Sequence, residues 1–175
     1  MTEEKKKNYD FTQKRSDYLT SNKLLEVVFD FMTQLKIEHN NKFDLDTCCS
    51  QTNIPADDYC IEGKADGLKD DWEKLNYCNP PFKECPKWVK KAFKEWFKCK
   101  TTVMLIPART ETAYWHDYIL EDGEEKRLGV HVKFLRKGYG FLNPDDNKPV
   151  GVYKNPLAIV VFDGRYHERN ERKVK

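Results

Sequence analysis

Residues 102–106 are the part of this sequence that most limits its fold. The segment carries no charged side chain, and it ends at Pro107. A short apolar run that stops at a proline is typical of a buried strand in a parallel sheet, because proline cannot continue the hydrogen-bond ladder. The run therefore predicts a sheet that is covered on both faces.

Strands and helices alternate along the rest of the chain. Apolar side chains recur at helical spacing in residues 24–35, where Thr20 or Ser21 could cap the helix, and in residues 88–97. Short strands are expected for residues 43–46, 59–62, 75–78, 130–135 and 157–162, a short helix for residues 115–120, and a loop for residues 138–155. This alternation predicts an α/β domain with a mostly parallel sheet, in which ligands bind outside the carboxyl ends of the strands.

The length of 175 residues fits a single domain. We expect a flexible polar arm in residues 1–14, the folded domain in residues 15–164, and a charged tail in residues 165–175. Hydrophobic residues make up 39% of the chain, which is enough for a core and excludes disorder over the whole length. No apolar run approaches the ~20 residues of a membrane span, and no secretion signal is visible, so we expect a cytoplasmic protein with no membrane partner.

The charge balance and the cysteines narrow the function further. The 31 basic and 29 acidic residues leave a net charge of +2, so any attraction to nucleic acid must be local. The six cysteines include no Cys-x-x-Cys pair, and the four histidines lie apart from them. We therefore expect reduced thiols and no metal site.

The strongest chemical signal is the Asn-Pro-Pro-Phe segment, Asn79-Pro80-Pro81-Phe82, which directly follows a short strand. Two prolines hold the turn rigid before a ligand arrives. The Asn79 amide oxygen and the Pro80 carbonyl are acceptors for the two hydrogens of an exocyclic amine, and Phe82 offers a face for stacking. The cradle suits an aminopurine that has been extruded from a duplex. On the pattern alone, a proline-rich turn that merely ends a strand is an equally good interpretation.

The order of motifs resembles that of the S-adenosylmethionine-dependent methyltransferases, and more narrowly the phage-type DNA N-6-adenine methyltransferases (the phage Dam family). The resemblance covers residues 16–162. The motifs that carry it are Phe43-Asp44-Leu45-Asp46, the step from Glu62 to Asp66-Gly67-Leu68, Trp72, the Asn-Pro-Pro-Phe segment, Trp88-Val89-Lys90-Lys91-Ala92, Leu105-Ile106-Pro107-Ala108-Arg109-Thr110 and Pro156-Leu157-Ala158-Ile159-Val160-Val161-Phe162.

The resemblance implies a single Rossmann-like methyltransferase domain with an antiparallel last strand and helices on both faces. It assigns Asp46 to the methionine end of the cofactor, Glu62 to the ribose hydroxyls, and Asp66 with Leu68 to the adenine. Thr20 is assigned to the cofactor as well, although Thr20-Ser21 stands where many relatives carry Thr-Pro. A second departure is Cys48-Cys49-Ser50, which replaces the usual glycine-rich loop.

Basic residues outside these motifs are the candidates for DNA contacts. Arg109 and Thr110 follow the buried strand, and Arg109 could hold a phosphate, brace the catalytic loop or form a structural salt bridge. Lys133, Arg136 and Lys137 precede the long loop and are the better candidates for contacts with a duplex.

The combined hypothesis is a DNA adenine-N6 methyltransferase that uses S-adenosylmethionine and acts on double-stranded DNA as a monomer or homodimer. If the protein is phage-encoded, it would act in the host cytoplasm or nucleoid. Two alternatives remain: a methyltransferase that acts on RNA adenine or protein glutamine, and a catalytically silent DNA-binding protein.

Overall fold

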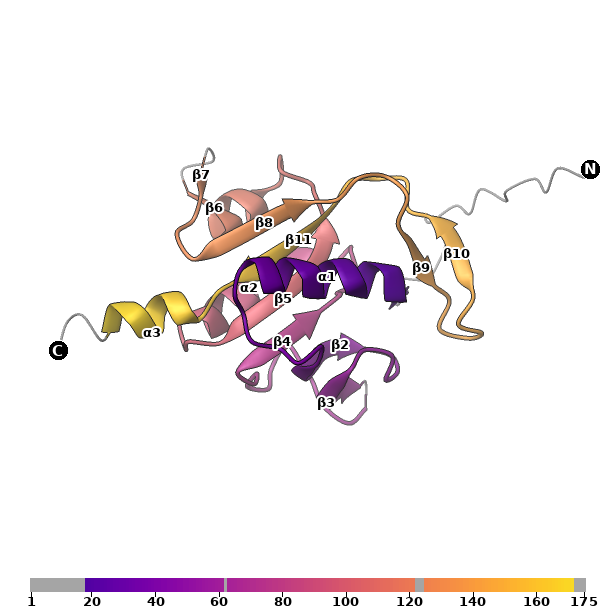
Figure 1. Ribbon diagram of the computed structural model, residues 1–175, viewed down its shortest axis with the longest axis horizontal. Helices are drawn as coiled ribbons and strands as arrows, with labels where there is room; N and C mark the ends of the chain where they lie inside the picture. The colour runs from indigo at the N-terminus through magenta and orange to yellow at the C-terminus, as the bar shows by residue number, and fades with distance from the viewer. Residues whose placement is uncertain (1–17, 62, 122–124, 172–175) are drawn as a thin grey trace, which may run out of the picture.

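The computed structural model describes residues 18–61, 63–121 and 125–171. The expected arm, residues 1–14, lies outside the described residues. A central sheet runs through the molecule, with helix α1 (Asn22–Gln34) on one face and helix α2 (Cys85–Trp96) on the other (Figure 1). The α/β class predicted from the sequence is confirmed.

The main sheet has six strands. Their spatial order is β3 (Ala56–Ile61), β2 (Phe43–Cys49), β4 (Leu75–Cys78), β5 (Thr101–Pro107), β11 (Leu157–Phe162) and β8 (Val130–Phe134). The pairs from β3 to β5 are parallel, whereas β11 is antiparallel to both β5 and β8.

The main sheet is therefore mixed, and its last strand along the chain, β11, is antiparallel, as the resemblance implied. The chain goes from β8 to its neighbour β11 through residues 135–156, which contain no helix. Parallel neighbours need a long crossover connection, usually a helix, so a return without one brings β11 in antiparallel.

The two helices bury one apolar face each. Ser21 is the N-cap of α1, and the helix packs Leu24, Val28 and Met32 into the core. Helix α2 begins with Pro86 in its first turn, where a missing N–H leaves no hydrogen bond unmade. The starts of both helices thus follow from local sequence.

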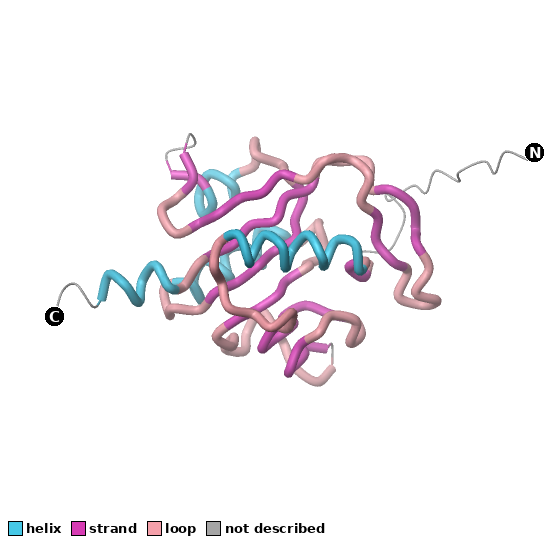
Figure 2. Tube along the Cα trace, viewed as in Figure 1, coloured by secondary structure: helices cyan, strands magenta, loops and turns pink. Residues whose placement is uncertain are grey.

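Strand β5 separates two apolar cores. Its Val103 and Leu105 belong to the core under α1, and its Met104 and Ile106 belong to the core under α2. Figure 2 shows the strands of the main sheet in magenta, with α1 in cyan in front of them. Alternate side chains of a strand point to opposite faces, and all of β5 is buried. The apolar run in residues 102–106 is thus explained by burial on both faces.

The segment expected to be a loop contains two strands that the sequence pattern did not predict. Strand β9 (Gly140–Leu142) pairs with β10 (Pro149–Val152) and with β1 (Leu19–Thr20), and the three form a small second sheet. These strands have only two to four residues, and β1 comes from the other end of the chain. No local periodicity reports such a pairing.

The remaining elements flank the main sheet. The short helix expected near residue 115 is a π-helix, η1 (Trp115–Ile119), and it is followed by the hairpin of β6 (Leu120–Glu121) and β7 (Glu125–Lys126). The start of the charged C-terminal segment forms helix α3 (Arg165–Glu171). The Arg165 guanidinium donates to Asp163 and to the carbonyl of Leu35, which holds the start of α3 to the domain. No helix within the described residues is long and apolar enough to cross a membrane.

Candidate functional site

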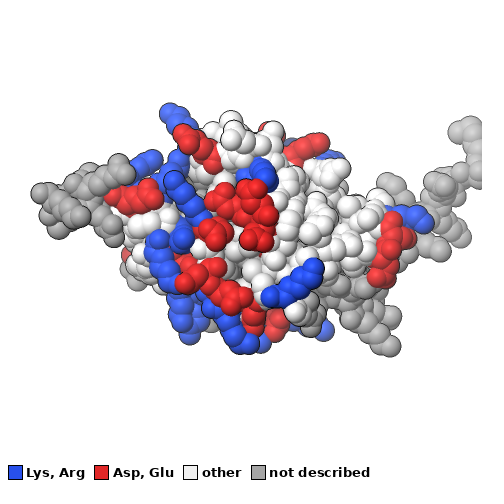
Figure 3. All heavy atoms as spheres, turned by 90° about the horizontal axis from the view of Figure 1, so that it is seen from below, with Lys and Arg blue, Asp and Glu red and all other residues white. Residues whose placement is uncertain are grey.

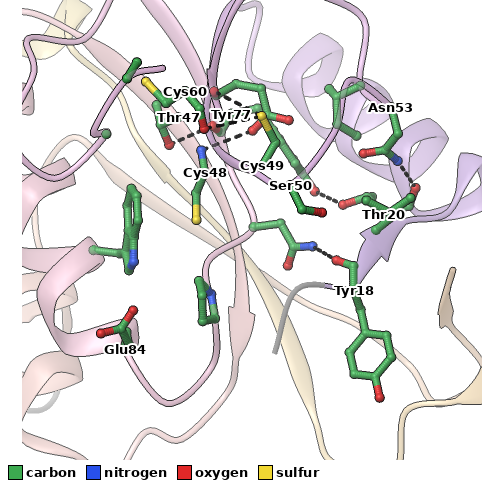
Figure 4. Close-up of a pocket in the computed structure, with 18 of the residues that line it drawn as sticks. Tyr18, Thr20, Thr47, Cys48, Cys49, Ser50, Asn53, Cys60, Tyr77 and Glu84 are labelled. Carbon is green, nitrogen blue, oxygen red and sulfur yellow. Dashed lines mark hydrogen bonds between the residues drawn. The ribbon is translucent and has the colours of Figure 1, made fainter. Parts of the chain in front are cut away.

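A cavity of about 580 Å³ opens at the carboxyl ends of the parallel strands β2 and β4. Ligands bind at this edge of α/β sheets, and the volume lies within the ~300–1,000 Å³ of ordinary ligand sites. Its lining comes from six parts of the chain: β1 with the residue before it, the end of β2 with the loop after it, the end of β3, the turn near Gly67, the end of β4 with the Asn-Pro-Pro-Phe segment, and the start of α2. In Figure 4, Tyr18, Thr20 and Asn53 lie across the cavity from Glu84.

The charged side chains of this lining are all acidic. Among the described residues, Asp46, Asp66 and Glu84 line the cavity, and no Lys, Arg or His does. An acidic cavity favours a ligand that carries a positive charge or many hydrogen-bond donors. It disfavours the pyrophosphate of a dinucleotide, which α/β sheets also bind at this edge.

Asp46 is the most perturbed of the three carboxyl groups. Its side chain is only 2% exposed, and none of the described residues forms an ion pair with it. The Cys48 N–H donates to Oδ1 across a long 3.4 Å. Burial raises the pKa of Asp46 from 3.8 to about 7, an effect that the Cys48 hydrogen bond only partly opposes. A bound cation would restore the ionised form.

Asp66 also lines the cavity, but in a polar environment. Its Oδ2 is 2.7 Å from Lys69 Nζ, and its Oδ1 accepts from the Leu68 N–H at 3.0 Å. These hydrogen bonds, first that from Lys69, lower the pKa of Asp66, so the group is ionised at neutral pH. Leu68 does not line the cavity; its side chain packs against the core under α2.

The Asn79 side chain has a defined orientation. Its Nδ2 donates to the Tyr18 carbonyl at 2.9 Å. A carbonyl only accepts, so the NH₂ group must face Tyr18, and Oδ1 is left as an acceptor for another partner. Asn79 lines the cavity, and its Oδ1 accepts from none of the described residues.

The rest of the Asn-Pro-Pro-Phe segment divides between the cavity and the core. Pro81 lines the cavity, and its carbonyl accepts from the Glu84 N–H at 2.8 Å. Pro80 is buried, and none of the described residues donates to its carbonyl. The Phe82 ring is half-buried and packs nearly perpendicular to Phe141 and Tyr153 rather than lining the cavity.

Thr20 also lines the cavity, but its hydroxyl already has a partner. Thr20 Oγ1 lies 2.8 Å from the Tyr77 hydroxyl, and both side chains are buried. Asn53 Nδ2 donates to the Thr20 carbonyl at 3.0 Å. Thr20 is thus tied to two other parts of the cavity wall.

A family model described as DNA N-6-adenine-methyltransferase (Dam) matches residues 24–172. The chain belongs to the Dam family. The match spans the main sheet, α2, most of α1 and most of the cavity lining, and it confirms the Dam-family part of the resemblance stated from the sequence. Searches of curated proteins and of solved structures found no match.

The residues of this Dam-family chain that were predicted to contact DNA fall into two groups. Arg109, Thr110, Arg136 and Lys137 are exposed. Arg136 and Lys137 share a small depression with Tyr153, the residue on which Phe82 packs. Lys133 instead packs against α1, where its Nζ lies over the Phe31 ring and 3.4 Å from Gln34 Oε1.

The cavity also contains residues that sequence reasoning did not select. Tyr18, Asn53 and Trp88 line it, as do Glu84 and Gly67. Trp88 belongs to the apolar stripe of α2, so its pattern indicated only core packing. The Cys48-Cys49-Ser50 loop lines the cavity as well. Burial first, then nearby acidic groups, raise the pKa of the Cys48 and Cys49 thiols, which are therefore neutral. Glu62 lies outside the described residues.

Proposed function

We propose that this Dam-family protein transfers a methyl group from S-adenosylmethionine to the N6 amine of adenine in double-stranded DNA, using a Rossmann-like domain. One observation carries the proposal. An acidic cavity with a buried carboxyl group at one end is bordered by an asparagine whose amide oxygen has no partner among the described residues.

The lining fits the proposed cofactor. S-adenosylmethionine supplies an electrophilic methyl group on a positively charged sulfonium. Asp46 would face the positive end, where its ionised form balances the charge. Asp66 would accept from the adenine amine, and Glu62, if it reaches the cavity, from the ribose hydroxyls. The neutral thiols of Cys48 and Cys49 let the chain approach closely without adding charge.

Asn79 and Pro80 would hold the target amine. Asn79 Oδ1 and the Pro80 carbonyl each accept one N–H hydrogen, which turns the nitrogen lone pair toward the methyl donor. Phe82 would stack on the extruded base from the edge of the cavity, with Phe141 and Tyr153 packed behind it. Pro81 keeps the turn rigid, since its carbonyl is bound by the start of α2.

The charge distribution supports one side of the molecule as the DNA surface. Figure 3 views the molecule from the side of the β3 edge, where acidic side chains gather in the middle of the face. Asp57 and Asp58 of the edge strand β3 are exposed. Exposed carboxylates repel phosphates. Arg136 and Lys137, on the Phe82 side of the cavity, are the better phosphate contacts, and Arg109 and Thr110 follow the neighbouring strand β5.

Methyl transfer from labelled S-adenosylmethionine tests the proposal. The purified protein is incubated separately with duplex DNA, RNA and a protein extract, and each product is digested and separated. We expect label in N6-methyl-2′-deoxyadenosine, and only from the DNA sample. Label in RNA or in protein glutamine would show that one of these, and not DNA, is the substrate. Binding of the cofactor or of DNA without any methylated product would indicate a catalytically silent binding protein.

Asn79→Ala gives the residue-level test. Only the target amine loses an acceptor, so we expect turnover to fall about 100-fold while the affinity for S-adenosylmethionine stays within about twofold. Asn22→Ala, at the exposed start of α1, is the matched control. Unchanged turnover of Asn79→Ala would remove Asn79 from the mechanism.

A further inference from the structure

Two side-chain hydrogen bonds join β1 and the residue before it to β4 and the residue after it. Tyr77 at the end of β4 reaches Thr20 Oγ1 at 2.8 Å, and Asn79, two residues later, donates to the Tyr18 carbonyl at 2.9 Å. Tyr18 and Thr20 are likewise two residues apart. Two parallel links of this kind hold one short segment of backbone in register with another.

The hydrogen bond between Thr20 and Tyr77 can hold β1 in position against β4. Thr20 is 3% exposed and Tyr77 is 1% exposed, so neither hydroxyl has ready access to water. A buried hydroxyl without a partner is unfavourable, which makes the pairing of the two strongly preferred. β1 has only two residues of its own, and within the described part of the chain it is also held by the pairing with β9 and the bond from Asn53.

The Tyr18 carbonyl is what orients the Asn79 amide. Were it to move, the Asn79 NH₂ group would lose its acceptor, and the amide would be free to rotate its oxygen away from the cavity. This carbonyl directly precedes β1, and the Thr20 hydroxyl is one of the contacts that hold β1 in place. The chain of contacts therefore runs from Tyr77 through Thr20 and Tyr18 to Asn79.

We propose that Thr20 and Tyr77 are positioning residues that hold the Asn79 amide oxygen toward the target amine, and that the Thr20 hydroxyl does not itself bind the cofactor. The inference rests on the proposed function, and it revises the cofactor role that the sequence suggested for Thr20. The two roles differ in what they change. A cofactor contact sets affinity, whereas a positioning contact sets turnover.

Thr20→Val tests this directly, because valine keeps the shape and removes the hydroxyl. We expect kcat to fall about tenfold, less than the ~100-fold that a 1 Å misplacement produces, with KM for S-adenosylmethionine within about twofold. Thr20→Ser should restore most of the turnover. Thr52→Val, at an exposed threonine in the loop after β2, is the matched control. A raised KM with unchanged kcat would overturn the inference in favour of a cofactor contact.

The double variant Thr20→Val with Tyr77→Phe sharpens the test. If each hydroxyl acts only through the other, the double variant loses no more turnover than either single variant. Additive losses would show that the two hydroxyls act separately and would overturn the inference.

A readout without methyl transfer separates this inference from the proposed function. In the wild-type protein without ligand, NMR should show slow hydrogen exchange of the Asn79 side-chain NH₂, because it donates to Tyr18. Thr20→Val should speed that exchange at least tenfold, and equal exchange would overturn the inference. If the wild-type protein methylates no substrate, the proposed function fails, while the exchange measurement still decides whether Thr20 positions Asn79.

Discussion

Replacing Asp46 by asparagine should stabilise the protein at alkaline pH and abolish tight cofactor binding. The Asp46 carboxyl group is 2% exposed and has no cationic partner among the described residues. Its negative charge is therefore unfavourable in the folded protein without ligand. Asparagine keeps the size and an acceptor for the Cys48 N–H but carries no charge.

The magnitude follows from the pKa of Asp46, which burial raises from 3.8 to about 7. At about 1.4 kcal/mol per pKa unit, this shift corresponds to about 4 kcal/mol in the free energy of unfolding. Because the folded pKa is the higher one, the folded state binds the extra proton, and stability is lost as pH rises from about 4 to about 7. Between pH 5 and pH 8 the free energy of unfolding of the wild-type protein should fall by about 3 kcal/mol relative to that of Asp46→Asn.

Urea unfolding at pH 5, 6, 7 and 8 measures this difference. The free energy of unfolding of Asp46→Asn should exceed that of the wild type by an amount that grows with pH and levels off above about pH 7. The same series with Asp58→Asn, an exposed carboxyl group on β3, corrects for the general effect of removing one negative charge. A gain that is constant with pH, or that shrinks as pH rises, would refute the reasoning about burial.

The same ionisation governs ligand binding. If Asp46 must be ionised to face a cation, the affinity of the wild-type protein for S-adenosylmethionine rises by about tenfold per unit as pH approaches 7, and then levels off. Calorimetry in buffers of different ionisation enthalpy should detect proton release on binding near pH 6. Asp46→Asn should bind S-adenosylmethionine weakly at every pH. In that case the Asp46 carboxyl group lowers the stability of the free protein but is needed for cofactor binding.

Two further changes probe the cavity and the DNA surface. Gly67→Ala should weaken cofactor binding at least tenfold or destabilise the fold by about 1–3 kcal/mol. The reason is that a Cβ at this position would lie 2.0 Å from the Thr47 carbonyl oxygen. Normal affinity and normal stability would contradict this close approach. Arg136→Ala with Lys137→Ala should weaken DNA binding and reduce the slope of log affinity against log salt by about two, as measured by titration at several salt concentrations. The pair Lys90→Ala with Lys94→Ala, exposed on α2, is the control, and an equal change in both pairs would argue against a specific DNA surface.

Local sequence predicted most of the main sheet. Strands β4 and β11 have the bounds that their apolar runs indicated, and both large helices lie where helical spacing placed them. The Asn-Pro-Pro-Phe segment marked the place where a strand ends and a ligand site begins. In each case the signal lies within a few residues of the structure it predicts, because apolar strand runs, helical spacing and proline turns are local features of the sequence.

The tertiary structure alone decided the second sheet and the wall of the cavity. The sequence pattern of β9 and β10 predicts a loop, since such short strands are ordered by pairing with each other and, for β9, with β1 from the far end of the chain. The hydrogen bond of the Thr20 hydroxyl to Tyr77 is likewise set by the fold. Sequence thus determined which segments form the main sheet and the two large helices, and which side chains could react. Only packing determined which acceptors stay free, because hydrogen-bond partners 57 and 61 residues apart are chosen by the fold and not by their neighbours in the chain.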